Sequence, residues 1–295
     1  MGFGKEFVWG AATSAYQIEG AALEGGKGKH IWDVYTENPG RVFDNHTGKV
    51  ACDHYHRFRE DVKLMKSIGL KAYRFSIDWS RVIPEGFGKV NEEGIVFYNQ
   101  LIDTLLENEI EPYITLYHWE LPYEIYKRGG WMNPQIVEWF GAYAKLVAER
   151  FSDRVTNYFT LNEPQCFVGL GFLTGEHAPG LKVPLQDTFE MAHNAMKAHG
   201  RAVQMLRQYG KQPLCVGYAP TCSMCYPETE KTEDIEAARH MLFSMQEDDQ
   251  NWTWNVAWWS DPVLLGHYPE EGLKRYEKYL PKITEEDMKD RKSVV

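Results

Sequence analysis

Five short apolar runs, separated by longer amphipathic stretches, constrain the fold of this 295-residue chain most strongly. Between the later runs, apolar residues recur three and four positions apart, which is the spacing of a helix with one buried face. Strand, helix and strand repeated at this interval predict parallel β/α units, as in an α/β protein of the barrel type. The predicted strands span residues 7–12, 71–77, 112–117, 155–161 and 214–219.

Three helices are predicted between these strands, and the third has a recognisable start. Asn133 is a good helix cap, and Pro134 after it suits the first helical position, so we expect that helix to open there. Asp187 is predicted to cap the helix that follows. No linker rich in Pro, Gly or Ser divides the chain, so residues 1–295 are predicted to form a single domain. The buried faces of the three helices carry Phe58, Val62 and Met65; Tyr98, Leu101, Ile102 and Leu105; and Ile136, Phe140, Tyr143 and Val147.

Charge and apolar run length limit the partners of the chain. The net charge of −10 argues against binding to nucleic acid, where a basic face supplies most of the attraction. The longest apolar stretches fall far short of the ~20 residues of a membrane span. The first residues show no secretory signal, so the expectation is a cytoplasmic protein.

The five cysteines are scattered and odd in number, which favours reduced thiols over a disulfide framework. Cys222 and Cys225 have the spacing of half a zinc site. No second pair with suitable spacing exists, so we expect two free thiols and neither a metal nor another cofactor, with the metal site as the weaker alternative.

Polar side chains gather where the predicted strands end. In a parallel barrel, functional groups collect at the C-terminal ends of the strands. Together such residues could hydrogen-bond the neighbouring hydroxyls of a sugar ring, with a tryptophan for apolar contact. A single histidine or arginine at such a place could equally be structural. The residues in question are Gln17 and Glu19 after the first run, Arg74 within the second, His118, Trp119 and Glu120 after the third, and Asn162 and Glu163 after the fourth.

Aromatic residues make up 14% of the chain, including ten tryptophans. Aromatic rings with a polar edge suit the flat C–H faces of sugars. A large aromatic core explains the same composition equally well.

Six segments, in order, resemble the signatures of family 1 glycoside hydrolases, the retaining β-glucosidases. The resemblance runs from about Glu6 to at least Tyr268. The segments are Phe7-Val8-Trp9-Gly10-Ala11-Ala12-Thr13-Ser14-Ala15-Tyr16-Gln17-Ile18-Glu19-Gly20, Asp53-His54-Tyr55-His56-Arg57, Tyr73-Arg74-Phe75-Ser76-Ile77, Leu116-Tyr117-His118-Trp119, Asn162-Glu163-Pro164 and His177-Ala178-Pro179-Gly180.

The resemblance implies a (β/α)8 TIM barrel, of which this chain would cover about the first five units. It also implies a β-linked glucoside or short oligosaccharide as the substrate. The roles it implies are general acid/base for Glu163, ligand of the sugar 2-hydroxyl for Asn162, ligands of the glycone sugar for Gln17 and His118, apolar sugar contact for Trp119, and orientation of the nucleophile for Arg74.

Three details refine the resemblance. Tyr117 and Trp119 around His118 resemble the form found in enzymes for unphosphorylated sugars, because 6-phospho-β-glucosidases tend to carry Ser and Phe there. Glu120 stands where the family often has Asp, and Asp78 where it often has Ser.

The nucleophile of the family is a Glu in a Glu-Asn-Gly motif near the seventh strand, and this sequence contains no such motif. We therefore expect a C-terminally truncated barrel domain that is inactive alone. Three hypotheses stay open: a truncated β-glucosidase, one half of a split enzyme with a C-terminal complementing chain, and a non-catalytic carbohydrate-binding remnant. An open barrel would also expose strand edges, which invite self-association.

Overall fold

Five strands form one sheet in which the spatial order of the strands follows their order in the chain. The computed structural model describes residues 2–289. Neighbouring strands pair in parallel, with Arg74 opposite both Ala12 and Tyr113. The strands are β1 (Gly10–Ala12), β2 (Ala72–Ser76), β3 (Glu111–Tyr117), β4 (Asn157–Asn162) and β5 (Cys215–Ala219).

The unbroken order from β1 to β5 distinguishes this sheet from a doubly wound one. A doubly wound sheet reverses its strand order at a switch point, where the ligand binds. Here each crossover adds the next strand on the same side, which is the topology of a β/α barrel. The predicted fold class is confirmed, with the sheet corresponding to the first five units.

Helices alternate with the strands, and shorter helical turns interrupt the loops. They are α1 (Ala15–Ile18), α2 (Ile31–Thr36), η1 (Phe43–Asn45), α3 (His54–Ser67), α4 (Trp79–Val82), α5 (Glu92–Glu107), α6 (Tyr123–Lys127), η2 (Gly130–Met132), α7 (Ile136–Phe151), α8 (Pro164–Val168), η3 (Gly169–Leu173), α9 (Leu185–Tyr209), α10 (Thr232–Phe243), η4 (Asp249–Trp254), α11 (Val256–Leu264), α12 (Glu270–Arg275), η5 (Glu277–Tyr279) and α13 (Glu285–Lys289).

The described residues divide into two compact units. The first contains residues up to 130 with 138–162 and 202–218, and therefore nearly the whole sheet; the second contains residues 131–137, 163–201 and 219 onward. The single domain expected from the sequence stays a prediction.

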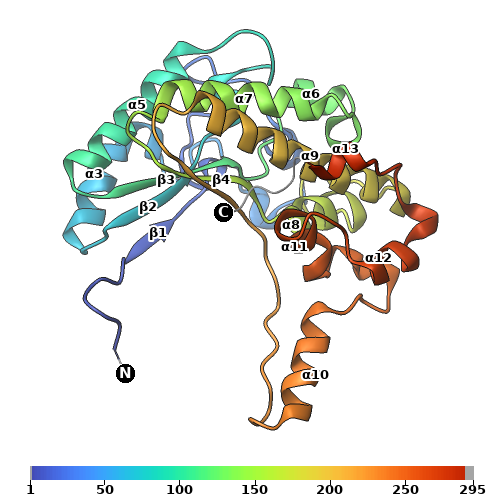
Figure 1. The fold of residues 1–295 in the computed structure, drawn as a ribbon. Helices are drawn as coiled ribbons and strands as arrows, with labels where there is room; N and C mark the ends of the chain where they lie inside the picture. Colours follow the sequence, from blue (N-terminus) through green and yellow to red (C-terminus); the bar gives the residue numbers. More distant parts are fainter. Residues whose placement is uncertain (1, 290–295) are drawn as a thin grey trace. The chain divides into compact units, whose positions relative to one another are not determined.

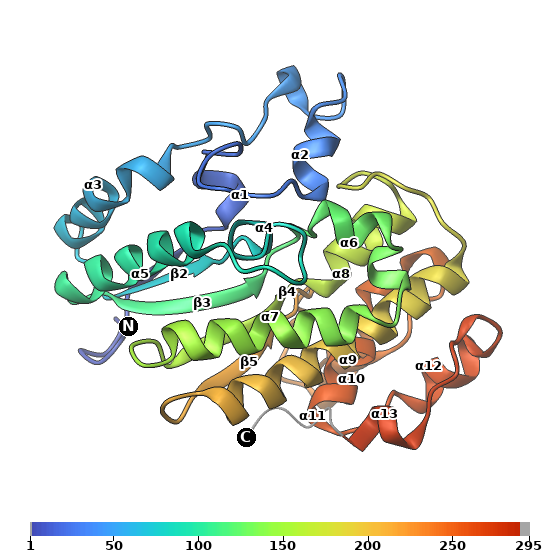
Figure 2. The same cartoon turned by 90° about the horizontal axis from the view of Figure 1, so that it is seen from above.

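In the first unit, α3, α5 and α7 cover one side of the sheet (Figures 1 and 2). Their apolar faces are buried, as the helical spacing predicts: Val62, Leu101 and Phe140 are at most 1% exposed. Burial of such side chains contributes roughly 1.5–3 kcal/mol each. This layer holds the strands in place, so the side chains at their C-terminal ends have fixed positions.

The structure corrects two predicted boundaries. Residues 7–9 are not part of β1, which begins at Gly10, although the carbonyl of Trp9 accepts bonds from the N–H groups of Lys71 and Ala72. Asp187 lies inside α9, which begins two residues earlier at Leu185, so Asp187 is a first-turn acid and not the cap. Asn133 does accept a bond from the Gln135 N–H at 2.9 Å, ahead of α7.

The second unit has an aromatic core. Phe189 stacks on Trp252 with ring centroids 4.0 Å apart, and Trp252 stacks on Trp259 at 5.8 Å. The segment 252–259 is the end of η4 followed by the first turn of α11. These tryptophans, together with the fully buried Trp131, belong to the core and not to a sugar-binding surface.

Candidate active site

A pocket of about 320 Å³ opens at the C-terminal end of the sheet in the first unit. Its volume is at the lower end of the range of small-molecule sites. The predicted sugar ligands Gln17, His118 and Trp119 all line it, together with Tyr16 and Trp32. Gln17 lies in α1 directly after β1, and His118 and Trp119 directly follow β3.

Asn162, the last residue of β4, connects three of the predicted site residues. Its Oδ1 accepts a hydrogen bond from Arg74 Nη2 at 2.6 Å, and its Nδ2 lies 3.2 Å from His118 Nε2. Its backbone carbonyl accepts a bond from Trp119 Nε1 at 2.9 Å. The ends of β2, β3 and β4 are thereby joined through one residue that is 3% exposed.

These bonds settle the tautomer of His118. Arg74 can only donate, so the amide oxygen of Asn162 faces it and the amide nitrogen donates to His118 Nε2. Burial, with the charge of Arg74, lowers the pKa of His118 to about 4, so the ring is neutral at pH 7 with its proton on Nδ1. That buried Nδ1 has no hydrogen-bond partner among residues 2–289.

Arg74 is held from two further sides. Its Nε donates to Thr115 Oγ1 at 2.8 Å, and its guanidinium lies over the Phe159 ring at 4.6 Å. Planar contacts of this kind orient a guanidinium more firmly than a lone charge pair does.

We call Asn162 with its partners Arg74, His118 and Trp119 the hub. Backbone strain marks Trp119 within the hub and Glu163 next to it. Trp119 has φ 87° and Glu163 has φ 45°, in the left-handed region that side chains other than glycine rarely adopt. Such residues cost about 1–3 kcal/mol each, persist only where the surroundings fix them, and cluster at functional sites. Sequence patterns do not reveal this strain.

Glu163 is joined to Asn162 by the peptide bond and begins the part of the second unit that contains α8. Its N–H donates to the carbonyl of Ala219 at 2.7 Å, and its carbonyl accepts from the Cys166 N–H at 2.9 Å. Burial and the neighbouring Glu163 raise the pKa of the Cys166 thiol to about 12, so this cysteine is not a nucleophile at neutral pH. The role of Glu163 as acid/base stays a prediction.

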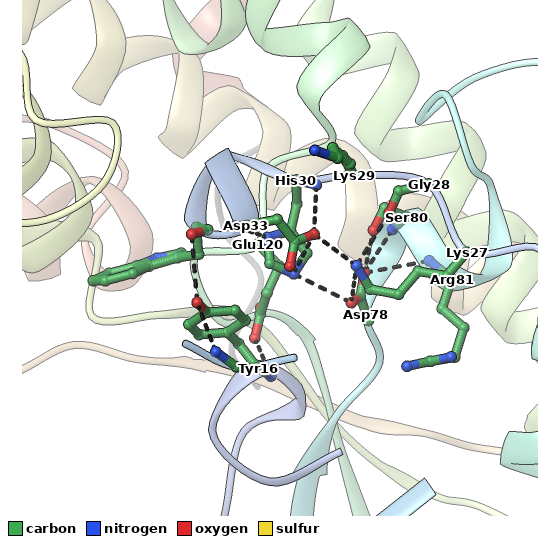
Figure 3. Close-up of polar contacts among 12 residues, drawn as sticks. Tyr16, Lys27, Gly28, Lys29, His30, Asp33, Asp78, Ser80, Arg81 and Glu120 are labelled. Carbon is green, nitrogen blue, oxygen red and sulfur yellow. Dashed lines mark hydrogen bonds and ion pairs between the residues drawn. The ribbon is translucent and has the colours of Figure 1, made fainter. Parts of the chain in front are cut away.

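A buried ionic cluster, which the sequence did not predict, also lies in the first unit (Figure 3). Lys27 Nζ lies 2.9 Å from Asp33 Oδ2 and 3.5 Å from Asp78 Oδ2, and all three side chains are at most 8% exposed. Burial alone would raise the pKa of Asp78, but Lys27 and Arg81 lower it to about 2, so it is ionised.

The cluster continues through Arg81. Arg81 Nε donates to Glu19 Oε2 at 2.9 Å, and Tyr98 Oη donates to Glu19 Oε1 at 2.7 Å. Glu19, noted from the sequence as a strand-end acid, is therefore committed to this cluster and does not line the pocket. His30 lies 3.5 Å from both aspartates, and burial lowers its pKa to about 4.

Neither a metal-binding cluster nor a membrane-spanning helix is found among the described residues. No group of three His, Cys, Asp or Glu in residues 2–289 is placed to hold a metal ion. Within the same range, no helix is long and apolar enough to cross a membrane. Cys222 is exposed, and its sulfur lies 3.7 Å from that of Met224.

Comparison with known proteins identifies the family. The family model for glycosyl hydrolase family 1 matches residues 1–294. β-Glucosidase A of Acetivibrio thermocellus is 48% identical over 276 residues, which are 94% of this chain and 59% of that protein. A β-glucosidase A of Thermotoga maritima is 43% identical over 289 residues and is covered to 62%.

Solved structures agree with these sequences. A family 1 β-glucosidase from Thermotoga maritima superposes with a TM-score of 0.88 at 41% identity, covering 99% of this chain and 63% of that one. A complex of the same enzyme with deoxynojirimycin matches with the same score. The chain spans about three fifths of the length of the curated relatives it matches.

Proposed function

Because the chain belongs to glycosyl hydrolase family 1, we propose that it serves the hydrolysis of β-glucosides and short β-linked oligosaccharides by a retaining mechanism. The observation that carries this proposal is the hub at Asn162, which ties Arg74, His118 and Trp119 together beside the pocket. Glu163, the proposed general acid/base, is the next residue in the chain.

Each polar group of the hub suits one task. The Nδ1–H of His118 is a buried donor without a partner among residues 2–289, and such a donor costs about 1–3 kcal/mol unless something binds it. Gln17 adds an amide at the pocket wall, and Trp119 adds an aromatic surface for the sugar. Asn162 would bind the sugar 2-hydroxyl, and Arg74 would orient the nucleophile.

In the proposed mechanism, Glu163 protonates the leaving oxygen while a carboxylate attacks the anomeric carbon, forming a glycosyl-enzyme. Glu163 then acts as a base and activates the water that hydrolyses it. Retaining enzymes place the two carboxyl groups about 5–5.5 Å apart. The sequence holds no Glu-Asn-Gly, so we propose that these 295 residues alone do not turn over aryl β-glucosides.

The second carboxylate would then come from further sequence of a longer protein or from a complementing chain. The test joins residues 1–289 to the part of the Acetivibrio β-glucosidase that this chain does not cover. Glu163→Gln in the joined enzyme should abolish cellobiose hydrolysis, because a poor leaving group needs the acid. The variant should keep glycosylation by p-nitrophenyl β-glucoside, and azide, which needs no base, should restore its turnover.

Glu149→Gln, at an exposed carboxylate of α7 that pairs with Lys145, is the matched control and should leave both substrates unaffected. Unchanged hydrolysis of cellobiose by Glu163→Gln would exclude Glu163 as the acid. If the joined enzyme binds deoxynojirimycin but hydrolyses nothing, the non-catalytic carbohydrate-binding alternative holds. Activity on mixing the two pieces as separate chains would favour the split enzyme.

A phosphorylated substrate is the second candidate. An aryl-phospho-β-D-glucosidase of Bacillus subtilis is 43% identical over 292 residues and is covered to 58%. Tyr117 and Trp119 around His118 favour the unphosphorylated sugar. Turnover of p-nitrophenyl β-glucoside and of its 6-phosphate by the joined enzyme would distinguish the two substrates. We expect faster turnover of the unphosphorylated glucoside.

We also propose association through the open edge of the sheet at β1. Every residue of β1 is exposed, as are Phe7, Val8 and Trp9 before it, at 44%, 57% and 54%. Unpaired edges with apolar neighbours favour pairing with a second chain. Light scattering should give a mass above 34.2 kDa.

A cytoplasmic location is proposed on the basis of the five free thiols, because reduced cysteines are typical of that compartment.

A further inference from the structure

We propose that Glu120 is a positioning residue that fixes the two sugar-facing segments of the pocket, at Gln17 and at Trp119, relative to each other. This inference rests on the proposed function, because it assigns to Glu120 the geometry of a sugar site. Glu120 itself does not line the pocket and is 2% exposed, so it acts through its neighbours.

The contact that carries the inference joins residues 104 positions apart. Glu120 Oε1 accepts a hydrogen bond from the Tyr16 N–H at 3.0 Å, as Figure 3 shows. Tyr16 is the neighbour of Gln17 in the chain, and Glu120 is the neighbour of Trp119. One hydrogen bond therefore links the segment after β1 to the segment after β3.

The Tyr16 N–H needs this partner. It is one of the first amides of the short helix α1, and such amides have no acceptor within the helix. The preceding amide, of Ala15, donates to Ser76 Oγ at 2.7 Å. Ser14, in the cap position, makes no side-chain bond to the helix. Glu120 therefore provides the acceptor that a capping side chain would otherwise provide for an amide of the first turn.

The segment that contains Tyr16 is also held by other contacts. The hydroxyl of Tyr16 accepts a bond from the Gly48 N–H at 3.1 Å and lies 2.9 Å from Thr36 Oγ1. Gly48 packs against the ring so closely that a Cβ there would lie 2.4 Å from it. Glu120 therefore connects the turn after β3 to a fixed support.

The turn on the other side is strained and depends on such a support. Trp119 has φ 87°, and its carbonyl accepts a bond from the Leu121 N–H at 3.0 Å. A bulky residue in this conformation persists only if its surroundings hold it. Trp119 is held at its ring by Asn162 and, through the next residue, by the bond from Glu120 to Tyr16.

The protonation state of Glu120 supplies the matched variant. Burial and the nearby Asp78 raise its pKa well above the usual range, which favours the neutral carboxyl. A neutral carboxyl resembles the amide of Gln in shape and keeps a carbonyl acceptor. Glu120→Gln should therefore preserve the bond, whereas Glu120→Met, similar in length and volume, should abolish it.

The first readout does not depend on sugar binding. Hydrogen exchange of the Tyr16 amide in the full chain should rise about tenfold in Glu120→Met and stay within twofold in Glu120→Gln, as expected for one lost hydrogen bond. Glu120→Asp, with the residue that the family often carries, withdraws the carboxyl by one methylene and should give an intermediate rise. If Glu120→Met fails to fold, the exchange rates of the Tyr16 amide in Glu120→Asp and Glu120→Gln are compared, and a faster rate in the Asp variant supports the positioning role.

The second readout is calorimetric titration with deoxynojirimycin. The Met variant should bind it about tenfold more weakly and the Gln variant like the wild type. Equal exchange and affinity in all variants, or equal damage from Gln and Met, would overturn the positioning role. If the wild type binds no deoxynojirimycin, the proposed function of this chain fails, and the exchange of the Tyr16 amide still decides the role of Glu120.

Discussion

The pocket hub and the buried ionic cluster both place polar side chains out of water within the first unit, yet they are built differently. In the cluster, Lys27 has Asp33, Asp78 and the carbonyl of Gly28 as partners, so its donors are met within the protein. In the hub, the Nδ1 of His118 is buried without a hydrogen-bond partner among residues 2–289, and the hub borders a pocket of about 320 Å³. His30 Nε2 and Arg81 Nη1 of the cluster also have no hydrogen-bond partner in that range, but the cavity beside them measures only about 10 Å³.

This difference teaches that burial of charge does not by itself indicate a functional site. Strongly shifted pKa values occur in both regions, since ion-pair networks shift them as active sites do. In the cluster the buried side chains face oppositely charged neighbours, and the cavity of about 10 Å³ beside them has room for about one water molecule and not for a sugar. The hub keeps a neutral donor and a strained tryptophan at a pocket wall, which is a costly arrangement without a ligand.

The largest expected effect comes from breaking the cluster. Arg81→Met leaves Glu19 buried without its cation, and the loss of one partner from such a pair costs about 3–5 kcal/mol of unfolding free energy. Urea denaturation measures it. Arg57→Met, which removes an exposed ion pair with Glu60, should change stability by less than about 0.5 kcal/mol. Equal effects of the two variants would show that the cluster is not structural.

A smaller effect is expected from a change in the hub, and it should weaken substrate binding and not the stability of the fold. His118→Ala in the joined enzyme should weaken transition-state binding by about 1–3 kcal/mol, the usual value of a lost sugar hydrogen bond. Its thermal unfolding should stay cooperative, because His118 faces the pocket. The ratio kcat/KM for p-nitrophenyl β-glucoside measures the first and calorimetry the second. Loss of the cooperative transition without a separate kinetic effect would instead make His118 structural.

A further effect is expected on the pH dependence of stability. The pKa of His118 is about 4 in the folded chain and about 6.5 when unfolded, so the unfolded chain binds more protons between these values. Stability is full above pH 6.5 and falls as the pH drops toward 4. His118→Gln should flatten this fall, whereas His46→Gln, at an exposed histidine, should not. Parallel curves for all three proteins would contradict the neutral His118.

Much of this fold was predictable because its signal is local. The spacing of Leu101, Ile102 and Leu105 predicts a helix with one buried face, and the apolar run before Asn162 predicts a strand. The site residues at strand ends followed from the parallel topology. The exception among the strands was residues 7–9, because the apolar run there extends beyond the paired segment Gly10–Ala12.

The ionic cluster and the strained turn were beyond sequence reasoning. Lys27 and His30 lie outside any periodic stretch, and their partner Asp78 comes from a distant loop, so the local pattern does not connect them. The available signal was the pair of departures from the family pattern, Asp78 and Glu120, whose side chains prove to be buried near each other and electrostatically coupled. The positive φ of Trp119 depends on contacts with Asn162 and Leu121, which lie outside the motif.

Hydrogen exchange of the 295-residue chain with and without saturating deoxynojirimycin tests the comparison most directly. The account predicts protection of the segments that line the pocket, residues 14–17 and 118–119, and no change in the ionic cluster at residues 27–30 and 78–81. Protection across the cluster with none at the pocket, or no protection at all, would contradict the assignment of the pocket as the sugar site.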